Sequence, residues 1–198
     1  MESEARDWVL PDEPTPVRLM NTVWADATGV HDHLESPADV DAWLDAVGLD
    51  CHGTPATPGD LVTARVLRDA ARRLAAHVTG DPRPAAASAT GNVLDALAAV
   101  NAAARDLPSP QLTLRDGRLR PTARARVSPV RTGIAQVASS IIELFSSRPD
   151  GDLLACHAPG CVLYFVKTHP RREWCSVACG NRARAARHYE KARSAGRR

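Results

Sequence analysis

The sequence predicts a mainly α-helical N-terminal domain with one β-hairpin, residues 1–150, followed by a small α+β module built around four cysteines, residues 151–198. Apolar residues recur at helical spacing in four long segments of the first part. A short alternating stretch surrounds an Asp-Gly pair, the sequence preferred in tight hairpin turns. Four of the five cysteines lie from Cys156 onward, in two closely spaced pairs.

The first two predicted helices each begin with a capping residue followed by proline. Ser36-Pro37 opens a helix that Gly48 ends, and Thr57-Pro58 opens a longer one that runs to about Gly80. Serine and threonine side chains accept hydrogen bonds from the first turn, and proline at the first helical position has no N–H to leave unpaired. Before these helices, His31 and His33 are expected on a surface loop.

Two further helices and the hairpin complete the N-terminal domain. An alanine-rich helix is predicted over Asn92–Arg105, and the most hydrophobic segment is predicted to form a helix that begins at Pro129. Between them, Leu112–Arg120 alternates around Asp116-Gly117 and predicts a hairpin. Pro149-Asp150-Gly151 marks the boundary before the cysteine-rich module.

The late cysteines form a C-x4-C pair, Cys156 and Cys161, and a C-x3-C pair, Cys175 and Cys179. Two such pairs favour one structural Zn²⁺ held by four thiolates, because each pair supplies two corners of a tetrahedron and none is left for water. Buried free thiols or disulfides are the alternative interpretation. His157 adjoins a ligand and is therefore expected to point away from the metal.

The spacing between the cysteine pairs also predicts local structure. Val162–Val166 is typical of a strand, Thr168–Arg172 of a turn and Glu173–Cys175 of a return strand. Ser176 is positioned to cap a long C-terminal helix whose first turn carries Cys179. A knuckle, a hairpin and a ligand-bearing helix, in this order, are typical of a treble-clef zinc finger.

The residues after the last ligand are expected to support the metal. Gly180 would let the backbone approach the cluster closely, and Asn181 would supply a hydrogen bond around it. Trp174-Cys175-Ser176 followed by Cys179-Gly180-Asn181-Arg182 resembles the CGNR zinc-finger family over about the last forty residues. That family is generally fused to an N-terminal ABATE domain, in bacterial proteins described as stress-related transcription regulators. The Asn21-Thr22 pair and the Leu67–Arg72 segment resemble parts of the ABATE domain.

Charge is unevenly divided along the chain. From Lys167 onward there are ten Lys/Arg and two Asp/Glu, whereas the other 166 residues hold fifteen and twenty-one, so the net charge of +2 hides balances of +8 and −6. Such asymmetry is the usual sign of a nucleic-acid contact made by one module. On a helical projection of the last helix, Arg184, Arg187, His188 and Lys191 share one basic face. The opposite, apolar side, with Tyr189, is expected to pack on the hairpin of the module. The predicted nucleic-acid contacts are Arg171, Arg172, Arg182, Arg184, Arg187, His188 and Lys191.

These features predict a cytoplasmic, DNA-binding transcription regulator whose N-terminal domain is a candidate sensor of a small molecule or stress signal. Asn21 and Arg68 are the candidate ligand contacts, with bracing of neighbouring loops as the alternative for Asn21 and a solvated or salt-bridged face for Arg68. A zinc-stabilised protein-interaction module and RNA binding are alternative functions of the finger. We expect no enzyme, because the sequence has no Gly-rich phosphate loop, nucleophile elbow or HExxH motif.

Overall fold

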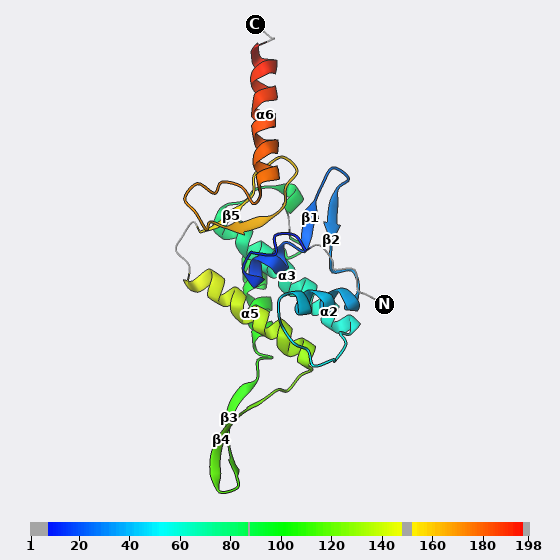
Figure 1. Ribbon diagram of the computed structural model, residues 1–198, viewed down its shortest axis with the longest axis vertical. Helices are drawn as coiled ribbons and strands as arrows, with labels where there is room; N and C mark the ends of the chain where they lie inside the picture. Colours follow the sequence, from blue (N-terminus) through cyan, green and yellow to red (C-terminus); the bar gives the residue numbers. More distant parts are fainter. Residues whose placement is uncertain (1–7, 87, 148–151, 196–198) are drawn as a thin grey trace.

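The computed structural model describes residues 8–86, 88–147 and 152–195 (Figure 1). The helices of the body are α1 (Thr15–Met20), α2 (Pro37–Ala46), α3 (Pro58–Thr79), α4 (Val93–Ala104) and α5 (Pro129–Ser147), with a 3-10 turn at Pro84–Ala86. The described strands form three antiparallel pairs: β1 (Val23–Ala25) with β2 (Val30–Asp32), β3 (Ser109–Arg115) with β4 (Arg118–Arg124), and β5 (Leu153–Ala155) with β6 (Tyr164–Val166). The last described helix is α6 (Val177–Ala195).

The residues predicted to cap the helices do so in the structure. Thr57 Oγ1 accepts a hydrogen bond from the Asp60 backbone N–H at 3.2 Å, while the Asp60 carboxylate accepts one from the Thr57 N–H at 2.9 Å. This reciprocal pair is a capping box, and Ser36 forms another at the start of α2. Gly80 ends α3 in the left-handed conformation, with φ of 60°. The mainly helical fold class with a C-terminal four-cysteine module is therefore confirmed.

The long helix α3 lies at the centre of the body. It packs against α1, α2, α4 and α5, and its Leu67, Ala71 and Ala75 side chains are almost fully buried. The same buried cluster continues into the C-terminal module, because Tyr164 and Val166 of β6 belong to it. The cysteine-rich module is thus packed onto the helices, and the division at residue 150 stays a prediction.

Two strand predictions differ from the structure. The N-terminal domain contains a second hairpin, β1–β2, where a loop was expected, because three-residue strands are too short to show alternation. In the module, Glu173–Cys175 forms no strand, and β6 pairs with β5, which precedes Cys156 in the chain. The strand pair therefore brackets the first two cysteines, and the treble-clef assignment stays a prediction.

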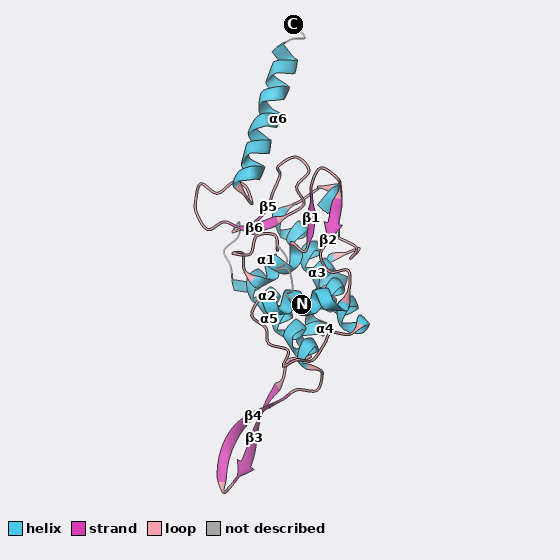
Figure 2. Ribbon diagram, turned by 45° about the vertical axis from the view of Figure 1, so that its right-hand side comes forward, coloured by secondary structure: helices cyan, strands magenta, loops and turns pink. Residues whose placement is uncertain are grey.

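Two elements project from the body at its opposite ends. The helix α6 extends from one end and the β3–β4 hairpin from the other (Figures 1 and 2). The hairpin turns at Asp116 and Gly117, with φ of 51° and 72°, as the predicted Asp-Gly turn requires. Among the described helices, none is both long enough and apolar enough to cross a bilayer.

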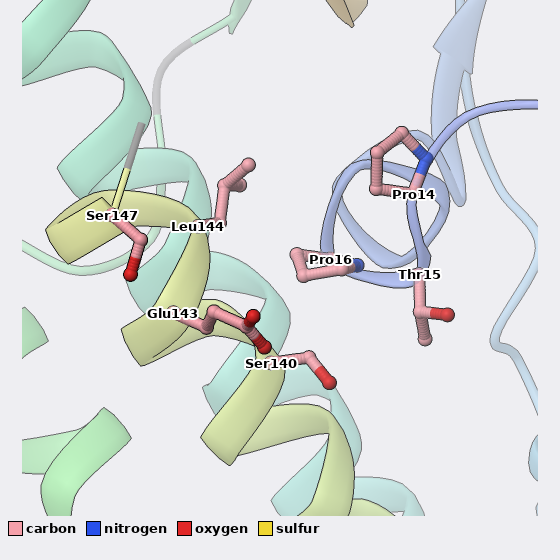
Figure 3. A pocket seen from close by; sticks show the side chains of 7 residues that line it. All are labelled: Pro14, Thr15, Pro16, Ser140, Glu143, Leu144 and Ser147. Atoms are coloured by element: carbon pink, nitrogen blue, oxygen red, sulfur yellow. The ribbon is translucent and has the colours of Figure 1, made fainter. Parts of the chain in front are cut away.

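A groove of about 510 Å³ separates the start of α1 from the last turns of α5 (Figure 3). Its described lining is Pro14, Thr15, Pro16, Ser140, Glu143, Leu144 and Ser147. Glu143 is the one ionisable side chain of that described lining.

Candidate metal centre and basic helix

The four late cysteines meet at one buried point. The sulfur atoms of Cys156, Cys161, Cys175 and Cys179 all lie within 4.8 Å of one another. Cys161 Sγ is 3.8 Å from Cys175 Sγ, and Cys175 Sγ is 3.3 Å from Cys179 Sγ. A tetrahedral Zn²⁺ with Zn–S bonds of about 2.3 Å has sulfur–sulfur edges of about 3.8 Å. The cluster matches a site for one structural zinc, while His157 is exposed and outside it.

The sulfurs also have the electrostatics of a cation site. Hydrogen bonds within the cluster, first from Cys161, lower the pKa of Cys156 to about 2, whereas the bond to Cys156 raises the pKa of Cys161 to about 12. The same neighbours raise the pKa of Cys175. Four adjacent sulfurs cannot all ionise against one another, so four thiolates require a shared cation. Bound zinc supplies that positive charge and ties the ligand-bearing segments together.

Hydrogen bonds to the backbone N–H groups of the cysteines hold the ligand-bearing segments in place. The first pair sits on a knuckle in which the Cys156 N–H donates to the Leu163 carbonyl and the Cys161 N–H to the Ala158 carbonyl, both at 2.9 Å. Gly160, with φ of +73°, makes the reversal possible. Ser176 caps α6 as predicted, since its Oγ accepts from the Cys179 N–H at 3.2 Å. The chain thereby presents Cys179 in the first turn of α6.

The residues around the last ligand have different roles from those expected. Arg182 donates to Cys179 Sγ at 3.0 Å, so the guanidinium, and not the Asn181 amide, supports the sulfur. The Asn181 oxygen accepts from Arg184. A Cβ on Gly180 would lie 3.1 Å from Trp174 Cδ1, so the glycine makes room for the indole. Gly180 therefore allows close packing of Trp174, which contacts the cysteine cluster, and its approach to the metal stays a prediction.

An arginine of the N-terminal part clamps the knuckle. Arg83 donates to the carbonyl oxygens of Cys156 and Cys161 and pairs with Asp81 through two nitrogens at 2.6 and 2.7 Å. Asp81 also accepts from the Tyr164 hydroxyl at 2.9 Å. Burial opposes ionisation of Asp81, but hydrogen bonds from Arg83 and Tyr164 outweigh it and hold its pKa below the usual value. Burial beside this carboxylate raises the pKa of Tyr164 to about 12.

A second set of contacts joins the segment just before α1 to the module. Glu13, which is 7% exposed, accepts from Arg172 at 2.6 Å and from the Val166 N–H at 2.9 Å. Arg172 also donates to the carbonyl oxygens of Val166 and Cys175 and lies over the Phe165 ring at 4.9 Å. The guanidinium of Arg172 is thus engaged inside the protein, although the sequence had placed it among the nucleic-acid contacts.

Comparison with protein families agrees with this architecture. A family model described as "Putative stress-induced transcription regulator", ABATE, matches residues 13–148, and the CGNR zinc-finger model matches residues 153–192. The chain belongs to the ABATE family. A search of curated proteins finds no significant match. The predicted pairing of an ABATE domain with a CGNR finger and one structural zinc is confirmed.

The two ligand candidates of the ABATE part both have protein partners. The Asn21 amide donates to the Tyr164 carbonyl at 2.9 Å and accepts from the Tyr164 N–H at 3.0 Å, so it braces strand β6 of the CGNR finger. Arg68 pairs with Asp32 at 2.5 Å and with Asp69 at 3.0 Å, and is 5% exposed. A ligand role for either residue stays a prediction.

We expect Asn21→Ala to destabilise the protein by about 2–4 kcal/mol, because it leaves the buried N–H and carbonyl of Tyr164 without partners. Denaturant unfolding followed by circular dichroism measures this loss. Asn101→Ala is the matched control, since Asn101 is an exposed residue of α4. Equal stability of the two variants would contradict the bracing role.

The remaining predicted nucleic-acid contacts of the CGNR finger are accessible. Arg171, Arg184, Arg187, His188 and Lys191 are all exposed, and Arg182 is exposed although it contacts Cys179. The expectation that the Tyr189 side of α6 packs on the hairpin was wrong. Tyr189 is 71% exposed, and it is Ala183 that is buried, because only the first turns of α6 lie against the module.

Sequence reasoning missed the clamping residues of the ABATE part. Glu13, Asp81 and Arg83 all act across long sequence separations, and so does Arg72, which donates to the Val162 carbonyl of the knuckle at 3.3 Å. A charged residue on the apolar side of a helix is a weak sign of such a role. Arg72, next to Ala71 on the buried side of α3, carried this signal, and so did Arg68.

Proposed function

We propose that the CGNR finger binds duplex DNA through α6 and that the ABATE part regulates transcription in response to a signal. The single observation that carries this proposal is the form of α6, a helix that projects from a zinc-anchored base and exposes its cations (Figure 1). An α-helix fits the major groove of B-form DNA. Cytoplasmic location and the absence of catalysis belong to the same proposal.

The cations of α6 are available for phosphate binding. Arg184, Arg187, His188 and Lys191 lie on one helical face, and no described carboxylate forms an ion pair with any of them. Each Lys or Arg that meets a phosphate releases condensed counterions and adds about −0.9 to the log–log salt slope. Zinc holds the base of the helix, and Arg182 and Ser176 fix its first turn to the cluster.

Replacing Arg184, Arg187 and Lys191 together by glutamine is expected to reduce the salt slope of DNA binding by about 2.7. Affinity for a duplex at 100 mM salt should fall by about tenfold or more. Fluorescence anisotropy with a labelled genomic fragment, from 50 to 200 mM salt, measures both quantities.

A variant of equal net charge separates a binding face from general electrostatics. Ala185→Glu, Tyr189→Glu and Ala192→Glu together also lower the charge by three, but on exposed positions of another side of α6. We expect this variant to keep the parent salt slope. Equal slopes for both triple variants would count against a phosphate-binding face.

Two alternatives are separated by the same proteins. A protein-interaction role predicts that the glutamine variant still retains its partner, since packing and not charge would hold that complex. RNA binding predicts preference for a single-stranded or duplex RNA of the same sequence, although Tyr189 is the exposed aromatic side chain that α6 offers for base stacking. Preference for RNA in a direct competition would overturn the DNA proposal.

A further inference from the structure

The projecting β3–β4 ribbon has two chemically different faces. Strand pairing places Arg115 opposite Arg118, Thr113 opposite Arg120 and Ser109 opposite Arg124. Side chains alternate between faces along a strand, so these four arginines share one face. The other face carries Pro110, Leu112, Leu114, Leu119, Pro121 and Ala123. Both faces are exposed, with Leu114 at 69% and Leu119 at 66%.

The arginine face has no ion-pair partner in the described part of the chain. No described carboxylate forms an ion pair with these four arginines, and Asp116 in the turn is the one acidic residue of the ribbon sequence. Outside residues 109–126 and the segment from Lys167 onward, the chain has ten Lys/Arg and twenty Asp/Glu. An acidic body repels polyanions, so the projecting cationic elements are the favoured places for a polyanion to bind.

The form of the ribbon suits a nucleic-acid groove. Two strands, with no described helix or third strand on either face, have the width of a β-ribbon that the major groove of B-form DNA admits. Arginines two residues apart on one strand are spaced by about 6.8 Å, so neighbouring side chains can reach different phosphates. Pro110 and Pro121 lie on opposite edges and lack N–H groups, which disfavours extension of the ribbon by another strand.

We propose that the arginine face of β3–β4 is a second duplex-DNA contact, separate from α6. The two contacts lie at opposite ends of the molecule, so one chain can hold two duplex segments or two parts of a bent one (Figures 1 and 2). The ribbon contact shares with the proposed function the nature of its ligand, duplex DNA, but needs none of the residues of α6.

The test replaces Arg115, Arg118, Arg120 and Arg124 by glutamine in the full-length, zinc-loaded chain, both in the parent and in the α6 glutamine variant. The probe is a labelled 24-base-pair DNA duplex, followed by anisotropy from 50 to 200 mM salt. We expect the salt slope to fall by about 3 to 4 in each background, with binding at 100 mM weakened by about 100-fold. An unchanged slope in both backgrounds overturns the ribbon contact.

The design distinguishes failure of the ribbon from failure of α6. If the salt slope changes when the ribbon arginines are replaced but not when the α6 cations are replaced, the proposed role of α6 is contradicted and the ribbon contact is supported. Leu112→Thr, Leu114→Thr and Leu119→Thr together are the control on the opposite face, and we expect them to keep the parent slope. Loss of DNA binding in that variant but not in the arginine variant overturns the proposal in favour of apolar docking.

Two further readouts complete the test. Zinc content and unfolding temperature should be the same in all ribbon variants, because every replaced side chain is exposed. An RNA duplex of the same sequence is expected to bind more weakly, since the deep, narrow major groove of A-form RNA excludes a ribbon. Tighter binding to the RNA duplex overturns the assignment to DNA.

Discussion

Cys179→Ser is expected to abolish stoichiometric zinc binding and to unfold the base of α6. Cys179 supplies one of four sulfurs that lie within 4.8 Å of one another, and Arg182 and Ser176 both bond to this residue. A serine hydroxyl stays protonated at neutral pH and does not replace a thiolate on zinc. In finger peptides a structural zinc contributes about 10–16 kcal/mol of apparent binding free energy, which is folding free energy. The loss should therefore be the largest of any single substitution in the chain.

The destabilisation should spread beyond the finger. Tyr164 and Val166 belong to the main buried cluster, and Asn21 and Arg83 bind the backbone of the finger. Loss of the metal therefore loosens contacts that the ABATE helices use as well. Elemental analysis of zinc per chain, with far-ultraviolet circular dichroism and thermal unfolding of the same samples, measures the effect.

Cys51→Ser is the matched control, because it makes the same chemical change away from the cluster. Cys51 is half-buried against the helical core, where burial raises the pKa of its thiol. This variant should keep one zinc per chain and lose little stability. Full zinc occupancy in Cys179→Ser, or a purified parent protein that is metal-free and yet keeps α6 folded, would refute the structural-zinc assignment.

Local signals in the sequence predicted most elements of the fold. Thr57 and Ser36 begin helices through bonds to residues three positions away, and Asp116-Gly117 needs only its own backbone conformation. The metal centre could be predicted in the same way, because zinc prefers thiolate ligands and the closely spaced pairs Cys156–Cys161 and Cys175–Cys179 supply four of them. Chemistry that depends on near neighbours in the chain can be inferred from one sequence.

The contacts that join the finger to the ABATE part were not predictable in the same way. Glu13 meets Arg172 across 159 positions, and Asn21 meets Tyr164 across 143. A basic residue in a cationic module predicts solvent or phosphate equally well, so Arg172 gave no sign of its buried acidic partner. The exposure of Tyr189 could not be predicted for a related reason. Helical spacing defines a face of the helix but does not show whether another element covers that face.

Arg72→Met is expected to cost about 3 kcal/mol or more. Arg72 is 2% exposed and donates to the Met20 carbonyl at 2.9 Å and to the Ala86 and Val162 carbonyls at 3.3 Å. Its guanidinium also lies 5.4 Å from the centre of the Tyr164 ring. Methionine fills much of the same space but leaves three buried carbonyl oxygens without this donor.

The chemistry of Arg72 explains why a charge is tolerated at the centre of the fold. Burial lowers the pKa of Arg72 from its usual value, yet a guanidinium stays protonated at neutral pH. No described carboxylate forms an ion pair with it, so carbonyl dipoles and the Tyr164 ring balance the charge. A rigid fork of donors can reach α1, the 3-10 turn and the zinc knuckle at once, which a lysine ammonium on one stem cannot.

Arg73→Met separates the role of Arg72 from a general effect of removing a cation from α3. Arg73 is half-buried and is the next residue of the same helix. The melting temperature should fall by about 10 °C for Arg72→Met, given about 2–4 °C per kcal/mol for a chain of this size. It should fall by far less for Arg73→Met. The melting temperature of Arg72→Lys should lie between those of the two methionine variants. Equal melting of the Arg72 and Arg73 variants would mean that the three carbonyls find other donors, and that Arg72 does not join the knuckle to the helices.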